Sequence, residues 1–345
     1  MCIYDYLIQN LNNDYKRLFE EKWKNFISEI GFPYYQNKTL ILGNKFRPKL
    51  FFWGTTFVKQ DIDILDYSKL INIAICIEAV HKASLLLDDI VDNDTLRYGY
   101  DTFHTQFGVN ESIAFSHYII GKSFDLLSRT LLDYSLDNIV VKKSLNLYSE
   151  TISSMTYGVM KEISGSFESL KDIQEISRLE TSVFLKNCLL LGYYLGNKIN
   201  SDIEDLFSKI GYKCGFLYQL LNDLEPFLNS QLNEYHKGTI NIDFDKCRKN
   251  IIIALIAEIL GYDTIKTIFI NKNCSSKIKF ILLNNNEINT FIKSEISKNY
   301  YDILLLISEL EKYSKNPIWG KKFQEFFKST IKWGVKRANL QISFS

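Results

Sequence analysis

The stretch HKASLLLDDIVDNDTLRYG, residues 81–99, places three carboxylates directly after a run of three leucines. On a helix Asp88 and Asp92 share one face because they are four residues apart, and Asp89 lies about 100° around from them. Like charges at this spacing repel each other. The leucines cover nearly the full circumference of the preceding turn, so the carboxylates emerge from a buried helix and need a countercharge.

A divalent cation is the countercharge that this pattern favours. Mg²⁺ is normally held by one or two carboxylates together with phosphate oxygens of a substrate. Arg97 follows the carboxylates and is suited to a bidentate phosphate contact. The stretch therefore predicts a magnesium-diphosphate site. The alternative interpretation is a solvated acidic helix end, which is the usual form of a charge run.

A second apolar stretch, GFLYQLLNDLEPF (residues 215–227), repeats this arrangement, because Asn222 and Asp223 directly follow two leucines. Two helices that each present oxygen ligands from an apolar wall can hold several cations around one diphosphate. The pairing is more specific than either stretch alone. Two unrelated helix ends are the alternative.

Composition and charge indicate a mostly helical protein that does not bind nucleic acid. Apolar residues make up 46% of the 345 residues, and there are only 4 prolines, so long uninterrupted helices are easily accommodated. The net charge of +1 comes from nearly equal acidic and basic counts spread along the chain, which gives no basic patch for a polyanion.

The cysteines and the N-terminus predict a cytoplasmic protein. The six cysteines lie far apart without a CxxC pair and are expected to be buried thiols in a reducing compartment. The first residues lack the basic-then-apolar order of a signal peptide. No apolar run is expected to reach the roughly 18 to 20 residues that span a bilayer, although peripheral membrane contact remains open.

Apolar residues recur at helical spacing along most of the chain, and the breaks fall at short polar loops. Residues 262–316 are polar and ambiguous. We predict one all-α domain over residues 1–345. The expected helices cover residues 5–30, 48–58, 66–92, 112–132, 138–166, 172–196, 202–228, 246–260 and 318–338.

The sequence resembles the trans-isoprenyl diphosphate synthases, the polyprenyl synthetase superfamily, because its motifs occur in the same order along the chain. The resemblance covers about residues 40–245, between GNKFRPKL and HKGTINI. EAVHKASLLLDDIVDNDTLRYG resembles the first aspartate-rich motif of the family, LETSVFLKNCLLLGYYLG its lysine-threonine helix and IGYKCGFLYQLLNDLEPF its second aspartate-rich motif.

This resemblance implies a fold and a reaction. The fold is an antiparallel helical bundle of the isoprenoid synthase type around a deep apolar cavity, usually as a homodimer. Two or three Mg²⁺ ions bridge the aspartates and an allylic isoprenyl diphosphate, and the metal stabilises charge on the departing diphosphate. An acceptor, ordinarily isopentenyl diphosphate, then captures the allylic carbocation.

The resemblance also implies roles for individual residues. The metal ligands are Asp88, Asp89, Asp92, Asn222 and Asp223. The first three are also catalytic together with Arg97, which contacts the allylic diphosphate. Further substrate-binding residues are Arg47, Lys45, His81, Thr181, Gln219 and Lys237. For His81, a hydrogen-bonded core histidine is the alternative.

Several positions depart from the family pattern. Asn44 stands at the lysine position of the acceptor site, and Tyr98 replaces the second arginine after the first motif. Charged hydrogen bonds of this kind are worth about 1.5–3 kcal/mol each, so affinity for an acceptor diphosphate is expected to fall unless Lys45 compensates. Glu180 replaces the allylic-site lysine. Pro226 replaces the last aspartate of the second motif, which leaves Glu225 as a misregistered substitute.

The residues one to two turns before the first aspartate predict the length of the donor chain. Val80, Ala83 and Ser84 are small, and a helical turn rises about 5.4 Å, near the length of one isoprene unit. A donor of C15 or longer is therefore favoured.

The leading hypothesis is a Mg²⁺-dependent prenyltransferase that passes the chain to an acceptor other than isopentenyl diphosphate. The alternatives are a chain-elongating farnesyl or geranylgeranyl diphosphate synthase, a terpene cyclase on the same scaffold and a non-catalytic regulatory subunit of a synthase. The complete DDxxD with Arg97 argues against the regulatory subunit, because an inactive subunit has no need to keep three mutually repelling carboxylates.

Overall fold

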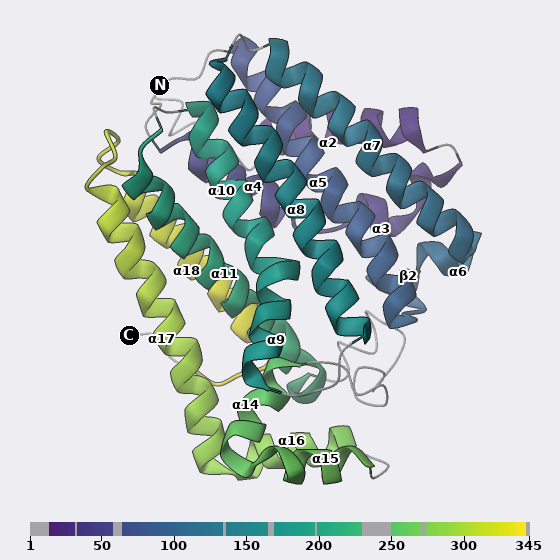
Figure 1. Ribbon diagram of the computed structural model, residues 1–345, viewed down its shortest axis with the longest axis vertical. Helices are drawn as coiled ribbons and strands as arrows, with labels where there is room; N and C mark the ends of the chain where they lie inside the picture. Colours follow the sequence, from purple (N-terminus) through teal and green to yellow (C-terminus); the bar gives the residue numbers. More distant parts are fainter. Residues whose placement is uncertain are drawn as a thin grey trace. The chain divides into compact units, whose positions relative to one another are not determined.

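A computed structural model describes residues 14–31, 33–57, 64–133, 136–164, 169–196, 199–229, 250–270 and 274–342. The predicted all-α class is confirmed, because almost all regular structure in these ranges is helical (Figure 1). Two compact units divide the chain. Unit 1 comprises Met1–Ile152, Asn187–Glu204 and Tyr313–Trp319, and unit 2 comprises Ser153–Lys186, Asp205–Lys312 and Gly320–Ser345.

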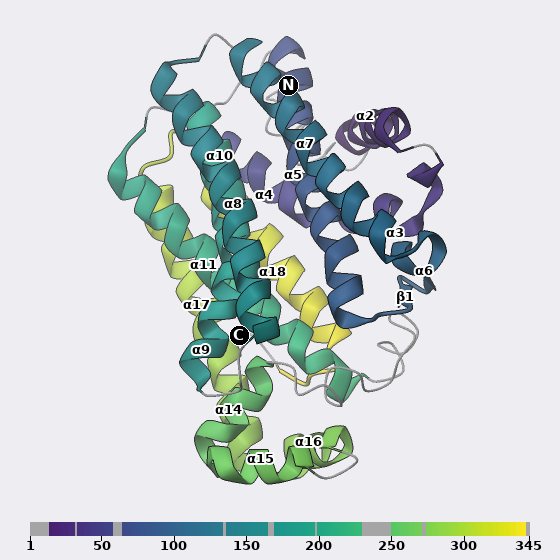
Figure 2. The same ribbon diagram turned by 45° about the vertical axis from the view of Figure 1, so that its right-hand side comes forward.

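Unit 1 is organised around the long helix α5 (Ile64–Asp92). Helix α7 (Val109–Asp133) packs along it, and Figure 2 shows the two side by side. The other contacts of α5 are made by α2 (Asp14–Ile30), α3 (Lys38–Ile41), α4 (Phe46–Thr55) and α6 (Phe103–Phe107). Unit 1 also contains the 3-10 helix η1 (Tyr34–Gln36), the two-residue strands β1 (Leu96–Arg97) and β2 (Tyr100–Asp101), and the first half of α8 (Asn138–Ser164).

Helix α5 corrects the expectation about apolar runs. Residues Tyr67–Asp92 form a helix that is long and apolar enough to cross a membrane by length and composition alone. Within the protein 72% of its most apolar window is buried. Burial by the surrounding helices of unit 1 accounts for this composition, as in the core helix of a helical bundle.

Glycines let α4 lie against the part of α10 (Val183–Gly196) that belongs to unit 1. A Cβ atom at Gly192 would lie 1.9 Å from the Phe51 carbonyl oxygen, and one at Gly54 would lie 2.1 Å from that of Leu189. Only glycine permits such close backbone approach. This contact fixes α4, which directly follows the loop that carries Asn44 and Lys45.

Unit 2 contains the remaining helices, apart from the last part of α10, the first turn of α11 (Ser201–Leu228) and Trp319, which belong to unit 1. The predicted helix 172–196 is helical throughout but has three parts, namely α9 (Leu170–Ser177), the short π-helix η2 (Arg178–Ser182) and α10. The others are α11, α14 (Ile251–Leu260), α15 (Tyr262–Ile270), α16 (Cys274–Asn284), α17 (Asn286–Glu311) and α18 (Trp319–Arg337). Within this unit α14 contacts α9, α15 and α17.

The predicted helices agree with the structure except at their ends and in the polar region. Helix α4 begins two residues before the predicted start, and α14 begins at Ile251 because the Asn250 side chain caps it by accepting from the Ile252 and Ile253 amides. The ambiguous residues 262–316 are largely helical, in α15, α16 and α17. The predicted residues 5–13 and 246–249 lie outside the described residues.

Three of the cysteines can be compared with the expectation. Cys76, Cys188 and Cys214 are buried thiols without a disulfide, and burial raises the pKa of each. The prediction of buried thiols is confirmed for these three.

Candidate active site

After the end of α5, a turn and a hairpin place Arg97 beside the carboxylates of Asp88 and Asp89. Asn93 adopts the left-handed conformation with φ 48°, its amide donates to the Ile90 carbonyl, and the Asp94 amide donates to that of Asp89. These two bonds form a Schellman motif. The chain then enters the β1–β2 hairpin, where Leu96 pairs with Asp101 and the two-residue turn has positive φ at both positions.

Arg97 binds two of the three predicted metal ligands. Its Nε donates to Asp89 Oδ1 at 2.5 Å and its Nη2 donates to Asp88 Oδ2 at 3.4 Å. The two aspartates differ in environment, because Asp89 is fully buried and Asp88 is 50% exposed. Asp92, on the last turn of α5, is half-buried. The structure thus brings together Asp88, Asp89 and Arg97, and their roles as metal and diphosphate ligands stay predictions.

Burial controls the charge of this group. It raises the pKa of Asp89 to about 7, although the Arg97 guanidinium opposes the change. Burial also disfavours the charge on Arg97, but Asp89 and Asp88 outweigh it and raise the pKa of Arg97 above its ordinary value. Asp89 is therefore a carboxylate whose ionised form needs more positive charge than Arg97 alone provides.

The oxygen atoms of this group fit a hard divalent cation. Asp89 Oδ2 is buried and has no hydrogen-bond partner among the described residues. An unsatisfied buried carboxylate oxygen is costly unless a ligand completes it. In the described part of the chain, no three acidic, histidine or cysteine side chains gather closely enough to surround an ion. Mg²⁺ takes one or two carboxylates plus oxygens from its substrate, and binding of the ion by Asp88, Asp89 and Asp92 stays a prediction.

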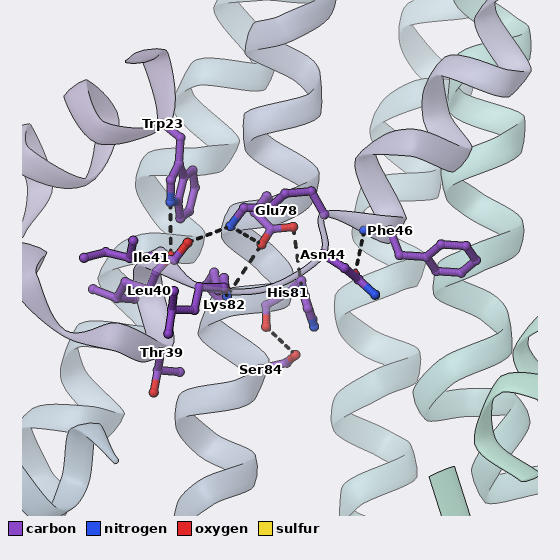
Figure 3. A network of polar contacts seen from close by, with 12 residues as sticks. Trp23, Thr39, Leu40, Ile41, Asn44, Phe46, Glu78, His81, Lys82 and Ser84 are labelled. Atoms are coloured by element: carbon purple, nitrogen blue, oxygen red, sulfur yellow. Dashed lines mark hydrogen bonds and ion pairs between the residues drawn. The ribbon is translucent and has the colours of Figure 1, made fainter. Parts of the chain in front are cut away.

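Two turns earlier on α5, a buried carboxylate binds cations from two elements. We call Lys45, Glu78, His81 and Lys82 the Glu78 cluster (Figure 3). Lys45 Nζ donates to Glu78 Oε1 at 3.0 Å and to the Ile41 carbonyl at 3.2 Å. Lys82 Nζ lies 3.7 Å from the same Oε1 and donates to the Leu42 carbonyl. His81 Nδ1 lies 3.7 Å from Glu78 Oε2.

The electrostatics of the cluster follow from burial and these pairings. Burial alone would raise the pKa of Glu78, but Lys45, His81 and Lys82 together hold it far below its ordinary value. Burial, aided by the charge of Arg47, lowers the pKa of His81 to about 3, so the imidazole is neutral. Burial also lowers the pKa of Lys82 to about 7 despite the nearby Glu78.

Asn44 and Lys45 have different roles in the loop between α3 and α4. Asn44 Oδ1 accepts from the amide of Phe46, the first residue of α4, at 3.0 Å and so forms an Asx turn around Lys45. Lys45 adopts a left-handed conformation with φ 54°, which is uncommon for a residue with a side chain. Its ammonium lies 5.3 Å from the ring centre of Trp23. Arg47 is half-buried in the first turn of α4.

Tyr98 lies beside Lys82. The Lys82 ammonium is 5.6 Å from the centre of the Tyr98 ring. A Cβ atom at Gly43 would lie 3.3 Å from both Lys82 Nζ and Tyr98 Oη. The loop, the buried lysine and the hairpin residue therefore meet at one place.

Glu78 and Lys82 were not among the site residues predicted from the sequence. The available signal was their position inside the apolar helix segment IAICIEAVHKASLLL, residues 73–87. Charged residues are almost never fully buried unless they are paired. Two opposite charges four residues apart in such a segment indicate a buried ion pair.

Unit 2 brings together three more predicted site residues. Thr181 Oγ1, from η2, donates to Gln219 Oε1 at 3.1 Å. Gln219 Nε2 donates to Asp223 Oδ1 at 2.8 Å, and Asp223 Oδ2 accepts from the Ile251 amide at 2.8 Å. A π-helix inside a longer helical segment is frequent at functional sites. The predicted Thr181–Gln219–Asp223 group is thus one connected network.

The other residues of the second motif differ from the expectation. Glu225 is buried and accepts from Arg337 Nη2 of α18 at 3.1 Å, so Arg337 binds the carboxylate that was considered as a substitute metal ligand. Asn222 is half-buried, and Pro226 has no N–H to donate to a carbonyl oxygen of the preceding turn. Glu180 packs closely against Gly158 of α8. Lys237 lies outside the described residues.

The residues predicted to set chain length lie on α5 beside the Glu78 cluster. Val80 and Ala83 are buried. Ser84 is half-buried and its hydroxyl donates to the His81 carbonyl at 2.8 Å (Figure 3). Their effect on the donor remains a prediction.

The fold is all-α, and acidic motifs lie on apolar helices, as in the isoprenoid synthase type of helical bundle. Comparison with known proteins gives the family. Residues 34–279 match the model of the polyprenyl synthetase family, so the chain belongs to that family. It is 26% identical to the geranylgeranyl diphosphate synthase of Sulfolobus acidocaldarius over 248 residues, 70% of each chain. It is 27% identical to that of Saccharolobus solfataricus over 164 residues, 46% of this chain and 48% of that synthase.

A solved structure supports the fold. The geranylgeranyl pyrophosphate synthetase of Pyrococcus horikoshii superposes with a TM-score of 0.74 at 20% identity, over 95% of this chain and 99% of that one. The family and the named relatives support a prenyltransferase enzyme.

Proposed function

We propose that the protein uses Mg²⁺ to ionise an allylic isoprenyl diphosphate and transfers the prenyl chain to an acceptor other than isopentenyl diphosphate. The observation that carries the proposal is the buried, unpartnered Oδ2 of Asp89 beside Asp88 and Arg97. A buried carboxylate with an unused oxygen and a half-exposed carboxylate next to it are suited to binding one cation from two sides.

In this proposal Asp88, Asp89 and Asp92 hold Mg²⁺ ions. Bound there, the metal neutralises charge that develops on the leaving diphosphate. Arg97 stays charged at all relevant pH values and is fixed by the two aspartates, so it can orient a phosphate oxygen without losing much side-chain entropy. The Thr181–Gln219–Asp223 network, with Asn222, provides a second group of oxygen ligands in unit 2.

Two features support an acceptor other than isopentenyl diphosphate. Asn44 uses its side-chain oxygen to accept from the Phe46 amide and carries no charge. Tyr98, at the position of a family arginine, carries none either. The small buried residues Val80 and Ala83 support a donor of C15 or longer.

Chain elongation with isopentenyl diphosphate is the second candidate. It is favoured by the names of the relatives, which are geranylgeranyl diphosphate synthases. It is also favoured by Lys45 and Lys82, two ammonium groups beside the loop that carries Asn44. A homodimer and a cytoplasmic location remain predictions.

Release of diphosphate tests the proposed ionisation. The purified protein is incubated with farnesyl or geranylgeranyl diphosphate and Mg²⁺, and inorganic diphosphate and organic products are measured. We expect metal-dependent release that Asp89→Asn abolishes. Asp125→Asn is the matched control, because Asp125 is a half-exposed aspartate paired with Arg129 on α7. No release by the wild-type protein would refute ionisation and would favour a non-catalytic regulatory subunit.

The organic products distinguish prenyl transfer from chain elongation and from cyclisation. Efficient chain elongation with isopentenyl diphosphate would refute the proposed acceptor. Cyclic hydrocarbons or alcohols formed from the donor alone would indicate a cyclase. A prenylated product that appears only when a lysate fraction of small molecules is added would support the proposal.

A further inference from the structure

Helix α16 exposes large apolar side chains that the described part of the protein does not cover. Its second half contains the run FILL, residues 280–283. Leu282 and the preceding Ile278 are buried where α16 contacts α15 and α17 (Figure 1). Phe280 and Leu283 point away from these contacts, since they are 67% and 58% exposed. Neighbouring exposed apolar side chains indicate a surface that binds a partner.

Two lysines border the exposed side of α16. Successive residues of a helix are turned by about 100°, so Lys277 lies about 60° from Phe280 on one side. Leu283 lies about 60° from Phe280 on the other side, and Lys279 lies about 40° beyond Leu283. Lysine side chains lay their methylene groups along apolar surface and keep the ammonium in a polar layer. Apolar side chains between lysines are typical of a helix that lies in the interface of a lipid bilayer.

The charge of this part of the chain has one sign. Residues 264–286 contain four lysines and no acidic residue, whereas the whole chain has 41 basic and 40 acidic residues. Each lysine near a negatively charged membrane surface adds attraction to it. The segment around α16 therefore complements an anionic lipid surface.

Leu305 of α17 shows that apolar exposure and this charge do not always occur together. It is 69% exposed, about as much as Phe280. Residues 299–311 of α17 contain three acidic residues and no lysine or arginine. An anionic surface would repel this part of α17, which makes Leu305 a matched comparison for Leu283.

We propose that α16 docks on anionic lipid membranes. Phe280 and Leu283 enter the boundary between head groups and hydrocarbon, and Lys277 and Lys279 contact lipid phosphates. The contact is reversible, because two apolar side chains and a few lysines bind a bilayer far more weakly than a membrane-spanning helix does. This docking goes beyond the proposed reaction and does not depend on it.

Sedimentation with vesicles tests the docking on the full chain. Vesicles of phosphatidylcholine, with or without phosphatidylglycerol, are mixed with the protein, and the bound fraction is measured after centrifugation. We expect binding to the anionic vesicles that weakens as salt rises, and little binding to phosphatidylcholine alone. The double substitution Lys277→Gln/Lys279→Gln should lower the partition coefficient on anionic vesicles about tenfold.

Leu283→Ser measures the apolar part of the contact. It should lower the same partition coefficient about five- to tenfold. Leu305→Ser removes the same kind of side chain from α17 and should leave the partition coefficient unchanged. Both leucines are mostly exposed, so both variants should fold and should unfold in urea like the wild-type protein.

The substitution Phe280→Trp locates the contact on the protein. Lipids with brominated acyl chains quench tryptophan fluorescence when the indole reaches them. The wild-type chain has four tryptophans, which set the background. Phe280→Trp should add a quenched component that is absent from the wild-type protein and from Leu305→Trp.

The outcomes decide between docking and its alternatives. The absence of wild-type binding to anionic vesicles overturns the docking, and an assembly that Leu283→Ser then dissociates in ultracentrifugation would make α16 an interface between copies of this chain. Equal binding by the wild-type protein and Leu283→Ser, or no added quenching in Phe280→Trp, overturns the assignment to α16. Diphosphate release without vesicles should be equal in the wild-type protein and Leu283→Ser. Failure of the proposed function would appear in that release assay alone.

Discussion

The substitution Glu78→Gln tests whether the Glu78 cluster is an ion network held by one carboxylate. The amide has nearly the same shape but no charge. Lys45 is 15% exposed and can turn toward water, whereas Lys82 is fully enclosed and cannot. Removing one partner of a buried ion pair costs about 3–5 kcal/mol. Because Lys82 stays buried and can lose its proton once Glu78 no longer raises its pKa, we expect a loss near the lower end, about 3 kcal/mol in the free energy of unfolding.

Urea unfolding, followed by tryptophan fluorescence, measures this loss. The double variant Glu78→Gln/Lys82→Met removes the unpaired buried amine as well as the carboxylate. Its stability should therefore exceed that of Glu78→Gln, by about 2 kcal/mol. The two substitutions should be strongly non-additive, since their side chains are in contact.

Two results would refute this reasoning. A loss of less than about 1 kcal/mol in Glu78→Gln would mean that the lysines do not depend on the carboxylate. Additive losses in the double variant would mean that Lys82 is stabilised by other groups. In either case Glu78 would not be the carboxylate that holds this cluster together.

The remaining predictions concern the donor site, the pH dependence of stability and the packing of unit 1. Arg97→Lys keeps the charge but loses the forked contact to the two aspartates, so Mg²⁺-dependent diphosphate release should fall about tenfold or more; an unchanged rate would contradict the assigned role. The pKa of Lys82 is about 7 in the folded protein and 10.5 for an ordinary lysine. Between these values the unfolded chain binds more protons, so wild-type stability relative to Lys82→Met should rise with pH from about 7 to 10.5; a flat difference in urea midpoint would argue against it. Gly192→Ala, which brings a Cβ within 1.9 Å of the Phe51 carbonyl oxygen, should cost about 1–3 kcal/mol or more in the same assay. Gly121→Ala on α7 is its control, because that Cβ meets nothing within 4 Å and should be neutral or stabilising.

The sequence alone predicted most of the helices and the residues of the acidic site. Apolar spacing identifies a helix because one face must be buried, and this signal is local. It was weakest in residues 262–316, where polar composition hides the buried positions of α17, such as Ile292, Ile296 and Ile303. Asp88, Asp89 and Arg97 were recognised because their motif lies within a few turns of one helix and the following hairpin.

Only the tertiary structure decided which of these residues are buried and which charges meet. The sequence treats Asp88 and Asp89 alike, but packing around α5 encloses Asp89 and leaves Asp88 half exposed. Lys45 and Glu78 are 33 residues apart and come together because α3 and the loop after it pack on α5. The energy of a charge depends on its solvent exposure and its neighbours, and both are properties of long-range packing that local sequence patterns do not contain.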